Sequence, residues 1–162
     1  MNLSVWEKKF RNLMVIYFFL FIGGGIIFYL RPDKVLGDII TLGTWLGFDD
    51  VQTVEDKYWV ILSVGLMMTI AACCFMASLK VPKTMHYAIP MLVGKLTTSG
   101  IGLHEFITAS PHRFHYLVIF LVDFPLFALA LLYYIRALRN KGDMGREFVY
   151  GEEIKEAAPV KE

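Results

Sequence analysis

The chain has 162 residues, of which 56% are hydrophobic and 15% aromatic, and its mean hydropathy is +0.53. Soluble domains are about 45–50% apolar and break these residues into short periodic runs, whereas here they form long uninterrupted blocks. A net charge of +1 gives no electrostatic basis for binding nucleic acid. These features exclude an ordinary soluble domain and indicate an integral membrane protein.

Each of four apolar blocks is long enough to cross a bilayer as a helix, which takes about 20 residues. Their ranges are 12–30, 58–79, 85–107 and 114–135. The blocks are solidly apolar rather than alternating, which favours helices over barrel strands. We therefore predict an all-α fold, an integral membrane four-helix bundle. The membrane domain would cover residues 1–142, and a polar cytoplasmic tail would cover 143–162.

The loop between the first two blocks, residues 31–57, has apolar residues at helical spacing. Val35, Leu36, Ile39 and Ile40 alternate with Asp38 and Thr41 in this manner. This pattern predicts a short interfacial helix in the first loop. A lid over the outer mouth of the bundle is an equally good interpretation.

Small residues recur every four positions in the second block, at Gly65, Thr69, Cys73 and Ala77. In lipid, such a ridge lets two helices approach closely. We expect this ridge to pack against another helix. Pro90, in the third block, is expected to kink its helix because proline lacks the backbone N–H donor.

Opposite charges occupy the middle of the third and fourth blocks. Lys95 is near the centre of 85–107, and Asp123 is near the centre of 114–135. The turn between these blocks is short, so the two helices should be antiparallel neighbours with the two charges at matching depth. Because an ionisable group at mid-bilayer costs about 2.5–3.5 kcal/mol on insertion scales, we predict a buried Lys95–Asp123 pair.

Two roles for this pair stay open. It could be an ion pair that fixes helix register and buries both charges. Alternatively, Lys95, Asp123, Thr98 and Ser99 could line an intramembrane polar cavity that binds a headgroup, an anion or a small molecule, or relays protons.

A second polar group is expected at the outer face, where His104 and Glu105 end the third block and His112 and His115 begin the fourth. Its histidines raise the alternative of a haem b ligated from neighbouring helices. However, these positions lie at the membrane surface, where histidines are common without a cofactor. We therefore predict neither a metal nor a cofactor.

Orientation follows from the lysines and arginines near the ends of the blocks. One side would carry eight of them and the other side four. The richer side holds Lys8, Lys9, Arg11, Lys80, Lys83, Arg136, Arg139 and Lys141, and the other holds Arg31, Lys34, Lys57 and Arg113. We predict a multi-pass protein of the cell (inner) membrane with both termini in the cytoplasm.

The four-block plan, the long first loop and the segment GKLTTSG from Gly94 to Gly100 resemble the small bacterial four-helix proteins described as DoxX-like. That resemblance implies quinone-related or thiol-related partners, but no redox motif accompanies it here, and fold alone does not carry function.

The predicted function is accordingly that of a non-enzymatic bundle or accessory subunit held by the Lys95–Asp123 pair. The alternative is a membrane protein that handles a small molecule, a lipid or protons at the polar cavity. An enzyme acting on a lipid or quinone through His104, Glu105 and His112 is the weakest hypothesis. Expected partners are the lipid bilayer and either further copies of the chain or a larger membrane complex.

Overall fold

The computed structural model describes residues 3–48, 58–81, 83–108 and 114–140, and all of its regular elements are helices. In chain order they are α1 (Val5–Leu30), α2 (Pro32–Trp45), α3 (Tyr58–Leu79), the 3-10 helix η1 (Met85–Ala88), α4 (Ile89–Thr108) and α5 (Phe114–Arg139). The prediction of an all-α chain is confirmed for these residues. The predicted tail, 143–162, lies outside them.

Helix α1 begins seven residues before the apolar block that predicted it. Ser4 accepts a hydrogen bond from the Glu7 backbone N–H at 3.2 Å, and the Glu7 carboxylate accepts one from the Ser4 backbone N–H at 2.7 Å. This capping box satisfies N–H groups that would otherwise be unpaired at the helix start. The cap therefore extends the helix into the polar segment that precedes the block.

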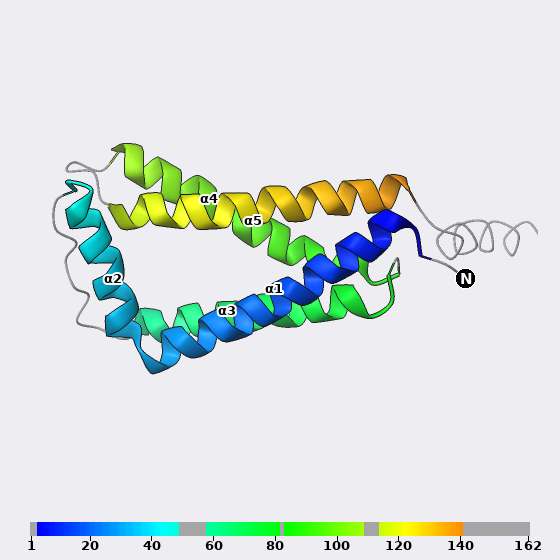
Figure 1. The fold of residues 1–162 in the computed structure, drawn as a ribbon, viewed down its shortest axis with the longest axis horizontal. Helices are drawn as coiled ribbons and strands as arrows, with labels where there is room; N and C mark the ends of the chain where they lie inside the picture. The colour runs from blue at the N-terminus through cyan, green and yellow to red at the C-terminus, as the bar shows by residue number, and fades with distance from the viewer. Residues whose placement is uncertain (1–2, 49–57, 82, 109–113, 141–162) are drawn as a thin grey trace, which may run out of the picture.

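Figure 1 shows two helix pairs, α1 with α3 and α4 with α5, which meet at one end of the molecule and diverge towards the other. At the end where they meet, α1 runs antiparallel to α5. The ring centroids of Trp6 and Tyr133 lie 6.0 Å apart, and the Tyr17 hydroxyl donates to the Leu126 carbonyl at 2.9 Å. The start of α1 and the end of α5 therefore share one end of the molecule.

Helix α2 lies across the opposite end, beyond the diverging pairs (Figure 1). Its last turns reach α5, since a Cβ on Gly43 would lie 3.0 Å from the Phe114 side chain. The Phe48 ring, just after α2, lies 5.1 Å from the Phe114 ring. This helix is the one that the sequence predicts in the first loop, and its position across the end of the bundle suits both the interfacial and the lid interpretation.

The small-residue ridge of α3 does not pack as predicted. Gly65 and Thr69 are exposed, and a Cβ on Gly65 would meet nothing within 4 Å. Ala77, at the other end of the ridge, is fully buried. Helix α3 instead turns its larger residues towards α1, where Met68 lies 2.8 Å from a Cβ built on Gly25. The first half of the ridge, Gly65 and Thr69, thus faces outwards.

The third apolar block contains two elements rather than one kinked helix. A 3-10 turn, η1, covers Met85–Ala88, and α4 begins at Ile89 with Pro90 in its first turn. Proline fits the first turn of a helix because the N–H groups there have no partner within the helix. The predicted kink is therefore wrong, and Pro90 helps to start α4 instead.

Three described helices are long and apolar enough to cross a membrane: α1 over Val5–Leu30, α3 over Val60–Leu79 and α5 over Phe114–Arg139. The fourth predicted span corresponds to η1 and α4, and α4 is not among the three. Its composition explains this difference, since Lys95, Glu105 and several hydroxyl residues interrupt its apolar sequence. The chain is thus a membrane-embedded protein with three strongly apolar helices and a less apolar α4 packed on α5.

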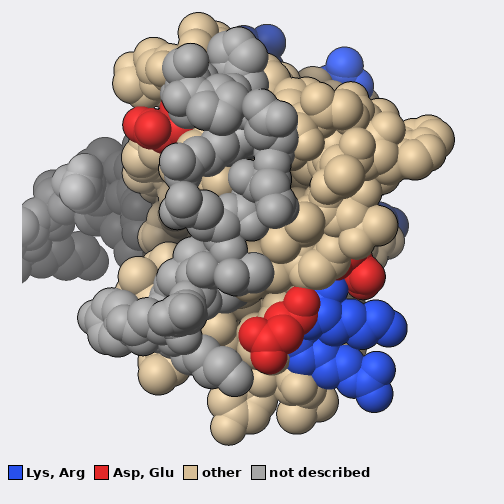
Figure 2. All heavy atoms as spheres, turned by 90° about the vertical axis from the view of Figure 1, so that its left-hand side faces the viewer, with Lys and Arg blue, Asp and Glu red and all other residues tan. Residues whose placement is uncertain are grey.

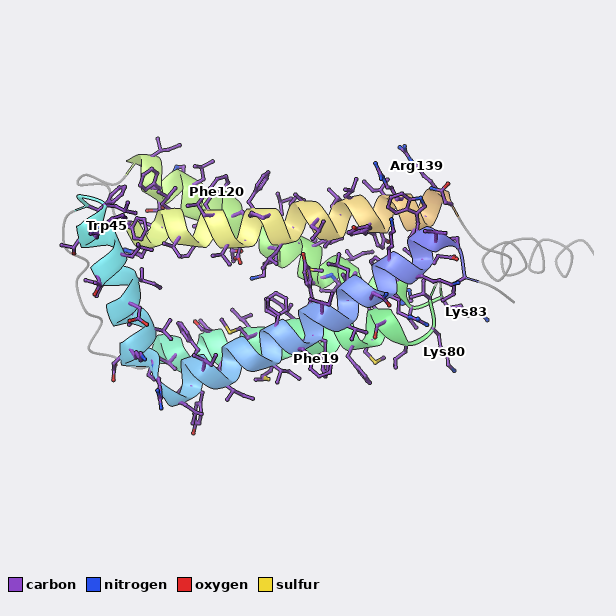
Figure 3. The ribbon with its side chains drawn as sticks, in the orientation of Figure 1. Phe19, Trp45, Lys80, Lys83, Phe120 and Arg139 are labelled. Atoms are coloured by element: carbon purple, nitrogen blue, oxygen red, sulfur yellow. The ribbon has the colours of Figure 1, made fainter. Side chains whose placement is uncertain are left out.

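The ends and the middle of the molecule differ in chemistry along these helices. Figure 3 shows Lys80, Lys83 and Arg139 at the end where the pairs meet, Trp45 at the α2 end, and Phe19 and Phe120 between them. Phe19 and Trp45 are 65% and 80% exposed, so apolar surface faces outwards along the helices. This distribution is typical of a protein surrounded by lipid, with polar and aromatic residues at the two interfaces.

Candidate functional site

The predicted charge pair is present between α4 and α5. The Lys95 ammonium donates to Asp123 Oδ1 at 2.6 Å, and each of the two side chains is only 12% exposed. The helices are antiparallel, because Gly102, two turns after Lys95, packs on the backbone of Tyr116, two turns before Asp123. The short connection and the similar depth of the two charges, which predicted the pair, therefore produce it.

Thr98 and Ser99 serve this pair in different ways. The Thr98 hydroxyl donates to Asp123 Oδ2, so that both oxygens of the carboxylate accept a hydrogen bond. The Ser99 hydroxyl is turned back onto its own helix, where it donates to the Lys95 carbonyl at 2.6 Å. Ser99 is 2% exposed. Thr98 thus belongs to the charged network, whereas Ser99 caps a carbonyl beside it.

A residue that the sequence did not predict completes the surroundings of Lys95. The Lys95 ammonium lies 4.8 Å from the centre of the Phe21 ring, which belongs to α1 and is buried. A cation over an aromatic face gains electrostatic stabilisation, and more so where water is excluded. Lys95 therefore connects α4 to both α5 and α1.

The chemistry of this arrangement is that of a closed, charge-neutral network. One ammonium and one hydroxyl donate to the two oxygens of a single carboxylate, and buried ionic groups are stabilised when they are paired and hydrogen-bonded in this way. Ser99 lies next to Lys95, but its hydroxyl contacts a backbone carbonyl and no general base. The network therefore joins α4 to α5, and within it no hydroxyl contacts a free general base.

The predicted outer-face cluster is only partly assembled. His104 Nδ1 lies 3.4 Å from Glu105 Oε1, but these residues are chain neighbours and their side chains are 70% and 43% exposed. The His115 ring lies close to that of its neighbour Tyr116, with centroids 4.0 Å apart and the planes tilted by 45°. His112 lies outside the described residues.

A search of the described ranges for three or more His, Cys, Asp or Glu side chains that could hold a metal ion finds no such group. Cys73 and Cys74 are free thiols on α3, and the second is fully buried.

Comparisons of the chain with protein-family models, curated proteins and solved structures each find no match. The function must therefore be argued from the geometry of the molecule itself.

Proposed function

We propose that this chain is a four-span, non-catalytic protein of the cell (inner) membrane, an accessory subunit whose α4 is held in the bilayer by the Lys95–Asp123 pair. The observation that carries this proposal is that both oxygens of Asp123 are occupied, one by Lys95 and one by Thr98. A carboxylate that accepts on both oxygens from one neighbouring helix is positioned to hold two helices together.

The direction of the chain supports four spans. If only α1, α3 and α5 crossed the membrane, the start of α1 and the end of α5 would lie on opposite sides. Yet Arg136, near the end of α5, lies 4.5 Å from the ring of Trp6 at the start of α1. One more crossing between α1 and α5 would place the start of α1 and the end of α5 on the same side, as this contact requires. α4 has 20 residues and suits that crossing, whereas α2, with 14, is shorter than the about 20 residues that a span needs.

Helix α4 would then be the span that depends on its neighbours. A lysine at the centre of a membrane helix costs about 2.5–3.5 kcal/mol on insertion scales. Pairing with Asp123 and contact with the Phe21 ring offset that cost. In this interpretation the charges are the reason that α4 stays against α5 and does not move freely in lipid.

The outward-facing small residues support an accessory role. Gly65, Gly94 and Gly100 would each accept a Cβ without meeting another atom within 4 Å. Small residues on membrane helices allow a second helix to approach closely. The chain therefore offers backbone surface to further copies of itself or to the helices of a larger membrane complex. The DoxX-like plan expected from the sequence stays part of this proposal at the level of architecture.

A double-mutant cycle tests the role of the pair. Lys95→Met and Asp123→Leu should each destabilise the protein by about 3–5 kcal/mol, because each leaves one charge buried without a partner. Combining them should restore stability to near that of the wild type, since similar apolar residues replace the whole pair. Unfolding of the purified protein in mixed detergent micelles provides the measurement. Proteins that copurify from native membranes provide a second one.

A second candidate function rests on Thr98, which is exposed although it donates to Asp123. A small polar molecule or a proton could reach the network from that side. In that case, the Lys95→Met/Asp123→Leu protein would fold normally and keep its partners, but would lose the cellular phenotype of the wild type. That result would favour ligand or proton handling, whereas a phenotype restored together with folding would favour the structural role.

A further inference from the structure

A pocket of about 510 Å³ lies at the corner where α1 passes into α2, beside the start of α3. Its apolar wall is formed by Leu30 of α1 and by Val60 and Ile61 of α3. Leu30 and Ile61 are 67% and 71% exposed, so this wall continues into the outer surface of the helices. The pocket therefore opens towards the region that lipid would occupy.

The polar wall of the pocket is formed by Arg31, Asp33 and Lys34, with Tyr29 beside them. Two cations and one carboxylate give it a formal charge of +1. Neither the Arg31 guanidinium nor the Lys34 ammonium forms a hydrogen bond or an ion pair with any residue in the described ranges. In Figure 2, which faces the α2 end, blue and red side chains lie together at the lower right.

If α1 and α3 cross the membrane, the pocket lies at the level of the phospholipid headgroups. It lies where α1 ends and α3 begins, and these are two of the helices that are apolar enough to cross a membrane. Arginine binds phosphate oxygens through two parallel N–H donors, and lysine adds a mobile point charge. Lysine and arginine side chains close to a membrane surface are each attracted to anionic lipid headgroups.

We propose that this pocket binds the phosphodiester of an anionic phospholipid in the leaflet on the α2 side. Arg31 and Lys34 contact the phosphate, and an acyl chain lies against Leu30, Val60 and Ile61. The net charge of +1 on the pocket complements the single negative charge of a phosphatidylglycerol headgroup. A bound lipid would brace the junction of α1, α2 and α3. This inference rests on the membrane location proposed above, but not on the role of the Lys95–Asp123 pair.

The test is a lipid titration of the full chain, purified in detergent and followed by native mass spectrometry. Dioleoyl phosphatidylglycerol is the probe, and the phosphatidylcholine and phosphatidylethanolamine with the same acyl chains are the zwitterionic comparators. We expect one phosphatidylglycerol to bind more tightly than either comparator. In Arg31→Gln/Lys34→Gln, its affinity should fall on the order of tenfold or more, given the contribution of each basic residue near an anionic headgroup.

The matched control removes the same charge from the other end of the molecule. Lys80→Gln/Lys83→Gln should keep the tight phosphatidylglycerol, because both residues lie at the basic end (Figure 3). Lys34→Gln alone, at an exposed position of α2, should weaken binding to an intermediate degree and guards against misfolding of the double variant. Thermal unfolding without lipid checks that all variants are folded.

Three results would overturn the proposal. Equal losses in the two double variants would show that binding follows net charge rather than this pocket. Equal affinity for the zwitterionic lipids would show that the headgroup charge is not recognised. Loss of the bound lipid on adding inorganic phosphate would assign the pocket to free anions. Failure of the chain to fractionate with membranes before purification would instead contradict the proposed function, so the two failures are distinguishable.

Discussion

The Thr98 hydroxyl has two kinds of acceptor within reach. It lies 3.1 Å from the Gly94 carbonyl of its own helix, as threonines in helices commonly do, and it donates across to Asp123 Oδ2. Thr69 of α3 offers a comparison, because its hydroxyl donates to the Gly65 carbonyl at 2.9 Å and it is exposed. The two threonines thus differ by the bond to a buried carboxylate.

Thr98→Val should therefore destabilise the protein by about 1.5–3 kcal/mol, the usual range for a hydrogen bond to a charged group. Thr69→Val is the control and should change stability by no more than about 0.5 kcal/mol, as exposed substitutions usually do. Unfolding of both variants in mixed micelles gives the comparison. A loss of stability that is the same in both variants would mean that the bond to Asp123 contributes nothing of its own.

The sequence predicts the Lys95–Asp123 pair but not all of the residues that surround it. Lys95 and Asp123 could be matched because a short turn joins their helices, so depth along one helix determines depth along the next. Phe21 could not be predicted, since its contact with Lys95 depends on how α1 crosses α4 and α5, and no short connection relates those helices. Likewise, the bond from Thr98 to Asp123 could not be predicted, because it depends on how α4 is rotated about its own axis.

Helices α4 and α5 pack closely at a glycine. On α4, a Cβ at Gly102 would lie 3.1 Å from the Tyr116 carbonyl oxygen and 3.2 Å from the Ile119 side chain. Gly100 belongs to the same helix, but a Cβ there would meet nothing within 4 Å. The contact at Gly102 lies on the same face of α4 as Lys95, so the spacing of α4 from α5 at this glycine also determines the reach of the ion pair.

We expect Gly102→Ala to destabilise the protein by about 1–3 kcal/mol, the usual cost of overpacking a close contact, because a backbone carbonyl cannot move aside as a side chain can. Gly100→Ala should be neutral or should stabilise the helix by up to about 1 kcal/mol, since alanine is the better helix former. Thermal unfolding in detergent separates the two variants. If both behave alike, α4 and α5 are not packed as closely as the structure shows.

The bounds of the elements were predictable where composition changes sharply. The block at 58–79 coincides with α3, whereas α1 and α5 extend beyond their blocks into polar residues. Apolar runs mark what lipid contacts, but a helix continues for as long as its backbone N–H groups find partners, as the Ser4 cap shows. The outward direction of the small-residue ridge of α3 was not predictable, because a row of small residues does not show which helix packs against it.

The whole molecule combines an apolar middle, a basic end and an end covered by α2. Lys80, Lys83 and Arg139 lie at the basic end, and Trp45 lies at the other (Figure 3). Two cations lie close to the Trp6 ring at the basic end, Lys9 at 4.6 Å and Arg136 at 4.5 Å from its centre. Because cytoplasmic ends of membrane helices carry an excess of lysine and arginine, the basic end should face the cytoplasm.

Labelling of single cysteines with a membrane-impermeant maleimide tests both the number of spans and their orientation. The background is Cys73→Ala/Cys74→Ala, which removes two thiols that lie within α3. Trp45→Cys should react in intact spheroplasts, because Trp45 is 80% exposed at the α2 end. Lys80→Cys and Arg139→Cys should react only after the membrane is opened. Each variant labelled after solubilisation controls for the intrinsic reactivity of its thiol.

The pattern of labelling distinguishes the alternatives because each crossing reverses the side of the chain. Lys80 follows α3 and Arg139 ends α5, so they share a side only if the chain crosses twice between them, through α4 and α5. Opposite accessibility of these two positions would mean that α4 does not cross and that three spans are correct. Accessibility of both in intact spheroplasts, with Trp45→Cys protected, would keep four spans but reverse the orientation. A lysine-bearing helix that crosses the membrane requires Lys80 and Arg139 to share a side, and the expected pattern in addition places that side in the cytoplasm.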